Sequence, residues 1–364
     1  MLTEPLAPYM VWAKTRKAAG IDLAGSNLLP CTLEDLPGAA EALQLAANND
    51  NGFAPLIEAI AVHKQVPTNR IMTGGGCSGV NFLVIAALVG SGDEVLIEQP
   101  GYDPLVGACQ LMGATVRRFA RPFERAFRID LEALQAAITP ATRLIIVSSP
   151  HNPSGVSLDA ETLRQLVGIA DRANAHVLVD EVYLDAVNLA AGDDALNPSA
   201  AELEGPVIAT ASLTKSFGLA GLRCGWAVAP PELVTRMHRV RDLVDVIGSV
   251  PAERLSAFAF SQLPALKART RALLTANLDL ARKFVAGHSQ LSVAEKPRSN
   301  VTFPRLAGVT DTTAFVDVVA EKHDVAVAAG RYFDAPSHFR ISLAGRTDRL
   351  AEGLDRLSEA LKSY

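Results

Sequence analysis

Three short apolar runs, each followed by polar side chains, decide the fold of this chain. They read LIIVSSPHNPSG (144–155), HVLVDEVY (176–183) and VIATASLTKSFGLAGLRCGWAV (207–228). Runs of this length and composition are typical of β-strands. Between the first two runs, residues 159–173 carry apolar side chains at helical spacing. Strands that alternate with helices need crossover connections, so the pattern predicts a mostly parallel sheet.

The same alternation continues on both sides of this stretch. We expect strands at residues 94–98, 115–119, 144–148, 176–180, 207–212 and 225–229. After Pro231 the pattern changes to longer helices with a few short strands. The last helix is expected over residues 347–361, with its leucines in one stripe behind a Thr347 cap.

The chain is expected to form two domains, since 364 residues are about the length of two. A large α/β domain at residues 45–250 would hold the mostly parallel central sheet. A smaller α+β domain would combine residues 1–44, an arm broken up by prolines and glycines, with residues 251–364.

Composition limits the functions that need considering. The 34 Lys and Arg against 39 Asp and Glu, a net charge of −5, give no basic surface for nucleic acid or an anionic membrane. The four cysteines form no Cys-x-x-Cys pair or Cys/His cluster, so reduced thiols and no metal are expected. The chain has no secretory-signal pattern and no run near the roughly 18 apolar residues of a membrane span. We therefore expect a soluble cytoplasmic protein.

A glycine run, TGGGCSG (73–79), comes directly before an apolar helical stretch. Free backbone amides at a helix start, together with the helix dipole, can bind a phosphate group, and glycine lets the backbone approach it closely. Glycine-rich turns also serve plain packing. The run fits neither the P-loop pattern nor GxGxxG after a strand.

Polar side chains at three predicted strand ends are candidates for a site, because ligand groups in open α/β sheets come from these ends. Asn152 lies in an Asn-Pro turn, Asp180 ends its strand, and Lys215 lies among small and apolar neighbours. Each also has a plain structural interpretation as a turn, a helix cap or a solvated charge. A lysine in such surroundings could instead act as an imine-forming amine, and Ser212 and Arg223 beside it are good phosphate partners.

The order and spacing of these segments are more specific than any one of them. Together the four segments resemble the class I/II aminotransferases, fold-type I enzymes that depend on pyridoxal 5'-phosphate (PLP). The resemblance extends from about residue 51 to residue 343. The lysine segment is close to the family signature, in which Gly-x-Arg-x-Gly follows the lysine, and departs from it at Cys224, where an aliphatic residue is more usual.

The resemblance assigns a role to each residue around the cofactor ring. Lys215 corresponds to the catalytic lysine, which forms a Schiff base with PLP and moves the proton between the substrate α-carbon and the cofactor. Asp180 corresponds to the carboxylate that keeps the pyridine nitrogen protonated. Tyr183 and Asn152 correspond to the donors to the phenolic oxygen, and Tyr102 to the aromatic side chain that stacks on the ring.

The resemblance also assigns the phosphate and substrate contacts. Gly76 and Cys77 correspond to the backbone amides on the phosphate, and Ser212 and Arg223 complete that group of donors. Arg340 corresponds to the arginine that binds the substrate α-carboxylate through two hydrogen bonds.

The resemblance implies an aminotransferase that moves an amino group between an L-amino acid and a 2-oxo acid, working as a homodimer. A lyase or decarboxylase of the same fold would use the same cofactor ligands and stays open. A PLP-binding regulatory module normally carries a DNA-binding winged helix, and the irregular, non-basic amino-terminal arm leaves no room for one. A plain dinucleotide-binding protein is disfavoured because GxGxxG is missing while the lysine segment is intact.

The substrate side chain is left open by the sequence. Ile85 corresponds to a place where some dicarboxylate-specific members carry lysine, so a preference for aspartate has no support there. Arg236, Arg239 and Arg241 are candidates for binding a second carboxylate, although a basic helix face is more often only solvated.

Overall fold

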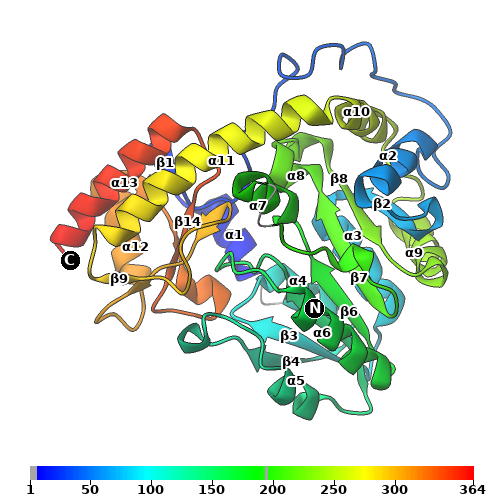
Figure 1. The fold of residues 1–364 in the computed structure, drawn as a ribbon, viewed down its shortest axis with the longest axis horizontal. Coiled ribbons are helices and arrows are strands. Elements are labelled where there is room, and N and C mark those ends of the chain that lie inside the picture. Colours follow the sequence, from blue (N-terminus) through cyan, green and yellow to red (C-terminus); the bar gives the residue numbers. More distant parts are fainter. Residues whose placement is uncertain (1–5, 193–195) are drawn as a thin grey trace.

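A seven-stranded sheet, with the strand order β2-β8-β7-β6-β5-β3-β4, forms the centre of the computed structural model, which describes residues 6–192 and 196–364 (Figure 1). The strands are β2 (Ile71–Gly75), β3 (Glu94–Gln99), β4 (Thr115–Ala120), β5 (Thr142–Ser148), β6 (His176–Asp180), β7 (Val207–Ser212) and β8 (Cys224–Val228). Strands β3 to β7 pair in parallel, and β8 runs antiparallel to both of its neighbours. The predicted α/β fold with a mostly parallel sheet is confirmed.

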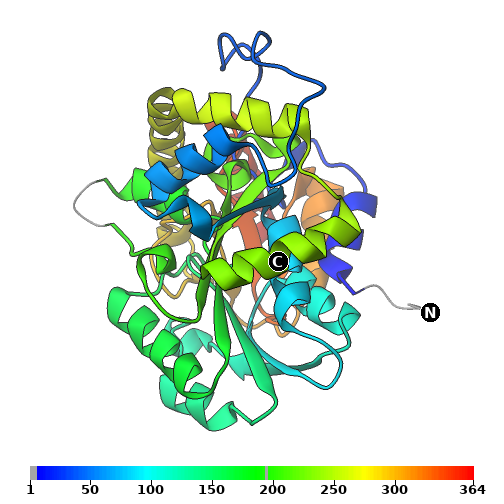
Figure 2. The same cartoon turned by 90° about the vertical axis from the view of Figure 1, so that its right-hand side faces the viewer.

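Helices cover both faces of this sheet because successive strand residues point to opposite sides. In β5, Ile145 and Val147 pack into one apolar layer, whereas Leu144 and Ile146 pack into the other. The first layer contains α2 (Ala54–Lys64), α5 (Leu131–Ala137), α6 (Ala160–Arg172) and α10 (Val250–Ser261). The second contains α3 (Gly76–Leu88), α4 (Asp103–Leu111) and α9 (Pro231–Val244). Figures 1 and 2 show the helices around the sheet from two directions.

A second hydrophobic core joins the amino-terminal segment to the last third of the chain. It contains α11 (Leu263–Ala286), α12 (Thr313–His323), α13 (Thr347–Lys362), β12 (Val325–Ala326) and β14 (Phe339–Ser342). Ile21 and Leu23 are buried in this core, and β1 (Ile21–Asp22) pairs in parallel with β12. The remaining α-helices and strands are α1 (Pro8–Thr15), α7 (Leu184–Ala191), α8 (Leu213–Phe217), β9 (Leu291–Ser292), β10 (Val301–Thr302), β11 (Arg305–Leu306) and β13 (Ala328–Ala329).

The division into residues 45–250 and the two flanking segments stays a prediction. Leu36 and Phe260 lie outside residues 45–250, yet both pack into the apolar layer on the sheet. Side chains from both sides of each predicted boundary therefore share one core.

The carboxyl-terminal helix α13 differs from the prediction at its start. Its leucine stripe is buried as expected, with Leu350 and Leu357 at most 1% exposed. Thr347, however, is the first helical residue, and the residue before it, Arg346, occupies the N-cap position without a capping side-chain bond. The predicted Thr347 cap is wrong because a capping side chain must lie on the non-helical residue that precedes the helix.

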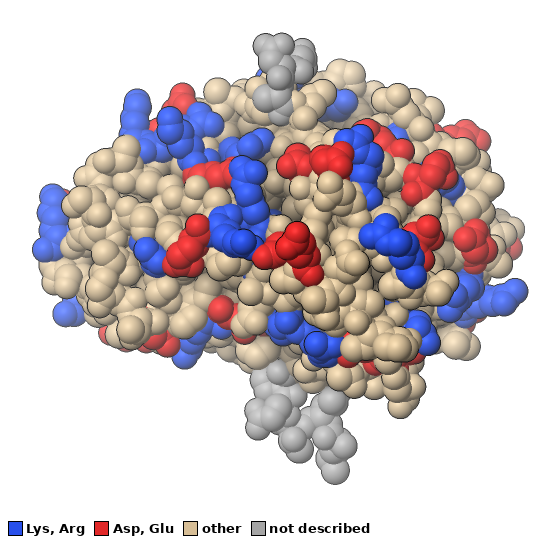
Figure 3. Space-filling model, turned by 60° about the horizontal axis from the view of Figure 1, so that its bottom comes forward, with Lys and Arg blue, Asp and Glu red and all other residues tan. Residues whose placement is uncertain are grey.

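Charged side chains of both signs are interspersed on the face of the molecule shown in Figure 3. Within the described ranges, no helix combines the length and the hydropathy needed to cross a membrane. The same residues contain no group of three or more His, Cys, Asp or Glu side chains that could hold a metal ion.

Candidate active site

Three neighbouring strands end at one edge of the sheet and bring candidate residues together there. Ser148, the last residue of β5, pairs with Asp180, the last residue of β6, and β7 pairs with β6 on its other side. Parallel strands bring their carboxyl ends to the same edge of a sheet. Asn152, Tyr183 and Lys215, which follow β5, β6 and β7, therefore converge.

The converging residues line a cavity of about 690 Å³. The amino-terminal segment contributes Tyr9, Ser26 and Asn27 to its wall. Gly76 and Arg340, which were also predicted for the site, do not line it. The predicted site residues that do line it are Cys77, Tyr102, Asn152, Asp180, Tyr183, Ser212, Lys215 and Arg223.

Lys215 lies on α8, the short helix that follows β7. Ser212 caps this helix, because its Oγ accepts a hydrogen bond from the amide two residues further on (3.4 Å). Nζ of Lys215 donates to Oδ1 of Asn27 (2.6 Å) and to Oγ of Ser26 (3.0 Å). Burial lowers the pKa of Lys215 to about 7, and the Arg340 guanidinium adds to this effect. Much of this amine is therefore neutral and nucleophilic at neutral pH.

Asp180 is a buried carboxylate with three hydrogen-bond donors. Its Oδ1 accepts from the Val182 amide (3.1 Å) and the Cys77 thiol (3.4 Å), and its Oδ2 accepts from Nδ2 of Asn81 (3.0 Å). Burial raises the pKa of Asp180, while these donors and the positive charge on Lys215 oppose the shift. Among the described residues, no Lys or Arg lies within ion-pair distance of Asp180. Its charge is thus available to a cationic group in the cavity.

Tyr183 brings to the cavity a buried hydroxyl group that has no hydrogen bond of full geometry within the described residues, although the Ser26 hydroxyl lies close enough to help lower its pKa. Burial raises the pKa of Tyr183 to about 12, so the phenol keeps its proton and remains a donor. Oγ1 of Thr214, in the same cavity wall, is also buried and without a partner. Buried polar groups normally have partners, so both hydroxyl groups suit a ligand that brings polar atoms of its own.

Arg340 on β14 is held in one orientation from two directions. Its Nη1 donates to Oδ1 of Asn152 (3.0 Å), and its Nη2 donates to the Ala24 carbonyl (2.9 Å) and to the Tyr9 hydroxyl. The rings of Tyr9 and Phe333 lie 5.0 and 4.6 Å from the guanidinium carbon. Because Oδ1 of Asn152 accepts from Arg340, the Nδ2 donor of Asn152 is left for another partner.

The glycine run begins α3 and lies against Arg223. Gly76 has a φ of +77°, and a Cβ there would lie 2.5 Å from Nη2 of Arg223. Gly225 on β8 is restricted by backbone instead, since its Cβ would lie 2.3 Å from the carbonyl carbon of Gly76. Ser212, which pairs with Gly225, lines the cavity beside these backbone groups. Amides at a helix start, a hydroxyl and a guanidinium together suit a phosphate group.

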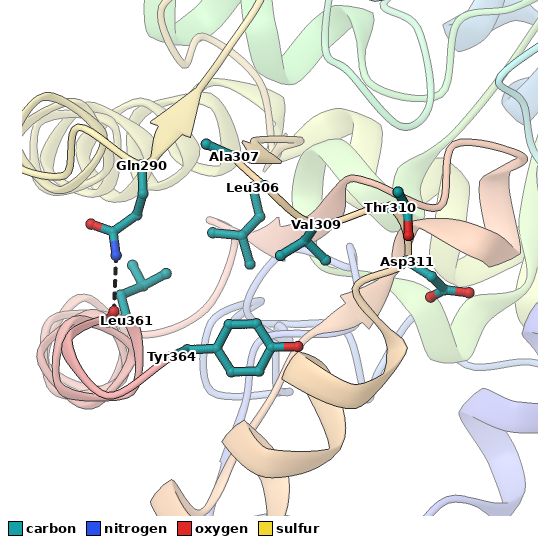
Figure 4. A pocket seen from close by; sticks show the side chains of 9 residues that line it. Gln290, Leu306, Ala307, Val309, Thr310, Asp311, Leu361 and Tyr364 are labelled. Carbon is teal, nitrogen blue, oxygen red and sulfur yellow. Dashed lines mark hydrogen bonds between the residues drawn. The ribbon is translucent and has the colours of Figure 1, made fainter.

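A second hollow lies between the end of α13 and the loop after β11, away from these residues (Figure 4). Nε2 of Gln290 donates to the Leu361 carbonyl at its edge (2.8 Å). Asp311 is the one charged side chain among the residues that line it. With no amine, thiol or imidazole in its wall, this hollow offers none of the predicted chemistry.

Comparisons with known proteins identify the family. The family model for aminotransferases of class I and II matches residues 38–357. The chain belongs to this family. Capreomycidine synthase of Streptomyces vinaceus is 30% identical over 372 aligned residues, which cover 99% of this chain and 95% of that protein. A probable N-succinyldiaminopimelate aminotransferase of Mycobacterium tuberculosis is 31% identical, with 84% of this chain and 83% of that protein covered.

A solved structure extends the likeness to the whole fold of this class I/II aminotransferase. The PLP-dependent aminotransferase of Streptococcus suis superposes with a TM-score of 0.92 at 24% identity, covering 100% of this chain and 99% of that one. The resemblance inferred from sequence is confirmed, and the protein is a PLP-dependent aminotransferase that acts on amino-acid and 2-oxo-acid substrates.

The cavity of this aminotransferase fits PLP. The donors around the start of α3 suit its phosphate, the carboxylate of Asp180 suits a protonated pyridine nitrogen, and the free hydroxyl of Tyr183 suits its phenolic oxygen. The roles of the individual residues stay predictions.

Four residues at the site were not found from the sequence. Tyr9, Ser26 and Asn27 contact Arg340 or Lys215 across more than 180 residues of chain, and no local pattern marks them. Asn81 did leave a signal, because it is the one polar residue in the run VNFLVIAAL (80–88). A polar side chain inside a buried helix needs a partner.

The sequence candidates for a second substrate carboxylate lie elsewhere. Ile85 is fully buried in the apolar layer of α3. Arg236 donates to the Ala87 carbonyl, and Arg241 donates to the Thr73 and Asp50 carbonyls. None of these side chains, nor Arg239, lines the cavity.

Proposed function

We propose that Lys215 is the catalytic lysine of this aminotransferase and forms the Schiff base that attaches PLP. The observation that carries the proposal is the amine of Lys215 in one cavity with an ionisable carboxylate and a group of donors that suits a phosphate. Burial, which lowers the pKa of this amine to about 7, supports the same role. PLP supplies an electron sink for the negative charge that forms at the substrate α-carbon. With PLP and substrate bound, Nζ of Lys215 would take the proton from the substrate Cα and return it at C4' of the cofactor.

Three other residues act on the ring and the substrate in this proposal. Asp180 holds the proton on the pyridine nitrogen by its negative charge. Tyr183 donates to the phenolic oxygen, which its unpartnered hydroxyl group supports. Arg340 is assigned to the substrate α-carboxylate, and its hydrogen bonds to Asn152 and Tyr9, which both line the cavity, hold the guanidinium beside it.

The phosphate is assigned to the backbone amides of Gly76 and Cys77 and to the side chains of Ser212 and Arg223. The steric limits on Gly76 support this, because the guanidinium of Arg223 occupies the space that a side chain would take. Tyr102, whose ring forms part of the cavity wall, is assigned to the ring face.

A homodimer in the cytoplasm completes the proposal. Leu243, Val246 and Leu45 are 88%, 64% and 81% exposed, and Asn49 Nδ2 donates to the Gly248 carbonyl (3.2 Å), which joins the two segments that carry them. Exposed apolar side chains on two segments that are joined in this way suit a subunit interface. The four cysteines are free, as expected in a reducing compartment.

A different PLP reaction on the same scaffold is the second candidate. A lyase or decarboxylase would use the same cofactor residues, and a relative named capreomycidine synthase aligns with 99% of this chain. The contacts to PLP do not distinguish these reactions, whereas the fate of the substrate amino group does.

The absorbance spectrum of the PLP-loaded protein distinguishes them. Single amino acids are added without any 2-oxo acid. Loss of the visible absorbance of lysine-bound PLP, with growth of pyridoxamine-phosphate absorbance and release of one 2-oxo acid, supports transamination and names the donor. Breakdown products with return of the original spectrum would assign the protein to the second candidate. A loaded protein that never shows the visible absorbance would contradict the role of Lys215.

A further inference from the structure

Asn81 is a buried amide in the apolar core of α3, and both ends of its side chain are hydrogen-bonded. Its Nδ2 donates to Oδ2 of Asp180 (3.0 Å), and its Oδ1 accepts from Oγ1 of Thr210 (2.7 Å). Asn81 is 4% exposed and Thr210 is fully buried. The three side chains come from α3, β6 and β7, so they connect a helix to two adjacent strands.

The Asp180 carboxylate and the Thr210 hydroxyl hold the two edges of the Asn81 amide. An ionised carboxylate only accepts, so the amide nitrogen of Asn81 faces Asp180, and the Thr210 hydroxyl donates to the amide oxygen on the other side. The helix places Cys77 one turn before Asn81, on the same face, and its thiol reaches the other carboxylate oxygen (3.4 Å). The helix that begins at the phosphate-binding amides thus also contacts both oxygens of Asp180.

The Asn81 amide donates to the charged form of Asp180, a carboxylate that is only 6% exposed. Removing an amide donor from a buried carboxylate favours the protonated form, because desolvation then acts with less opposition. A neutral Asp180 would no longer stabilise a proton on the pyridine nitrogen. The titratable groups that face Asp180 are the Cys77 thiol, Lys215 and Tyr183. Glu181, the next residue, bonds instead to the Ser199 hydroxyl and the Ala200 amide.

We propose that Asn81 is a positioning residue that holds Asp180 ionised and directed at the pyridine nitrogen of PLP, and that Thr210 supports this contact by holding the oxygen end of the Asn81 amide. The proposal rests on the role assigned to Asp180 above. It extends the cofactor site by two side chains that do not line the cavity and act through Asp180 alone.

The test uses PLP labelled with 15N at the ring nitrogen, because the NMR shift of this nucleus reports its protonation directly. In the wild-type holoenzyme we expect a protonated nitrogen at neutral pH. In Asn81→Leu, which removes the donor at similar size, we expect the midpoint of ring deprotonation to fall by about 1–2 pH units, the size of a hydrogen bond to a charged group. The kcat of the same variant should fall roughly in proportion to the lost protonated fraction.

Two further variants separate this role from a general loss of packing. Thr210→Val removes the hydroxyl group at constant shape and should shift the midpoint in the same direction by a smaller amount. Val84 lies one turn further along α3 and is fully buried among apolar side chains. The variant Val84→Ala should therefore lower the Tm and leave the 15N titration unchanged.

The outcomes distinguish this proposal from the one on which it rests. A wild-type ring nitrogen that is unprotonated at neutral pH would remove the role of Asp180, and this inference with it. A protonated wild type with an unchanged titration in Asn81→Leu would overturn the role of Asn81 alone. If Asn81→Leu fails to fold or to bind PLP, the titration of Thr210→Val decides in the same way.

Discussion

Burial acts on Lys215 and Asp180 in opposite senses. It lowers the pKa of the amine to about 7 and raises the pKa of the carboxyl group, because each loses hydration of its charged form. Their opposite charges attract each other across the cavity and limit both shifts. Lys215 can therefore exchange a proton at neutral pH, which a base that takes a proton and returns it must do.

Lys215→Ala is expected to abolish the covalent link to PLP, since Nζ is the proposed attachment point. Borohydride reduction followed by peptide mass spectrometry should find the cofactor on Lys215 in the wild type and on no residue in the variant. Lys14→Ala is the matched control, because Lys14 is the other lysine in the cavity wall. The control should keep the reducible link. PLP trapped as before in Lys215→Ala would contradict the assignment.

The rate at which PLP joins the apoprotein should follow the titration of Lys215. Only the neutral amine attacks, so the rate should fall about tenfold per pH unit below pH 7 and level off above it. In Arg340→Gln the midpoint should move upward, because a nearby positive charge that disfavours the ammonium form is removed. Stopped-flow absorbance measures both. A wild-type midpoint near the pKa of a free lysine side chain, roughly 10, would contradict the expected shift of Lys215.

The elements differ in how well the sequence predicted them. The β6 and β7 bounds match because apolar, β-branched runs end there at polar residues. Strand β2 was not predicted, because two of its five residues are glycines with little β-propensity, and it forms through its pairing with β8. A local pattern cannot reveal a strand that depends on a partner about 150 residues further along the chain.

Two glycines of the same run should respond differently to a side chain. Gly76→Ala places a Cβ at positive φ and 2.5 Å from Arg223 Nη2, so the guanidinium must move. The Kd for PLP should rise about tenfold or more, and a tenfold rise corresponds to a loss of about 1.4 kcal/mol of binding free energy. Gly79→Ala, a few residues along α3 with nothing within 4 Å of its Cβ, is the control.

Gly79→Ala should stabilise the helix by up to about 1 kcal/mol and keep the Kd for PLP. Fluorescence titration with PLP and thermal unfolding give both quantities. Equal Kd values for the two variants would show that Gly76 is not needed for close approach at the phosphate site.

At the scale of the molecule, the active site draws on both hydrophobic cores. Asp180 ends one strand of the sheet and Lys215 follows another, whereas Arg340 comes from β14 and is held by Tyr9, 331 residues away in the chain. The residue types at the site could be recognised from sequence order. Their partners could not be recognised, because contacts between residues hundreds of positions apart produce no regular spacing in the sequence.

The exposed leucine at the end of α9 gives a test of the proposed homodimer. Leu243→Asp places a charge on a side chain that is 88% exposed in one chain, so the free energy of folding should change little. If this surface is the subunit interface, light scattering should show a dimer for the wild type and a shift to monomers for the variant. Glu359→Gln on the exposed face of α13 is the control. An unchanged dimer in Leu243→Asp would exclude this surface as the interface.

The pairing of β1 with β12 has a consequence for the order of events on the ribosome. Ile21 leaves the exit tunnel early, and its partner Val325 follows some 300 residues later. Throughout that interval the sheet can form, whereas the segment around Ile21 still lacks the side chains of the last third of the chain against which it packs. A nascent chain stalled before β14 thus contains Lys215 and Asp180 but lacks Arg340, the residue proposed to bind the substrate α-carboxylate. Synthesis therefore supplies the amine proposed to hold PLP well before the arginine proposed to select the substrate.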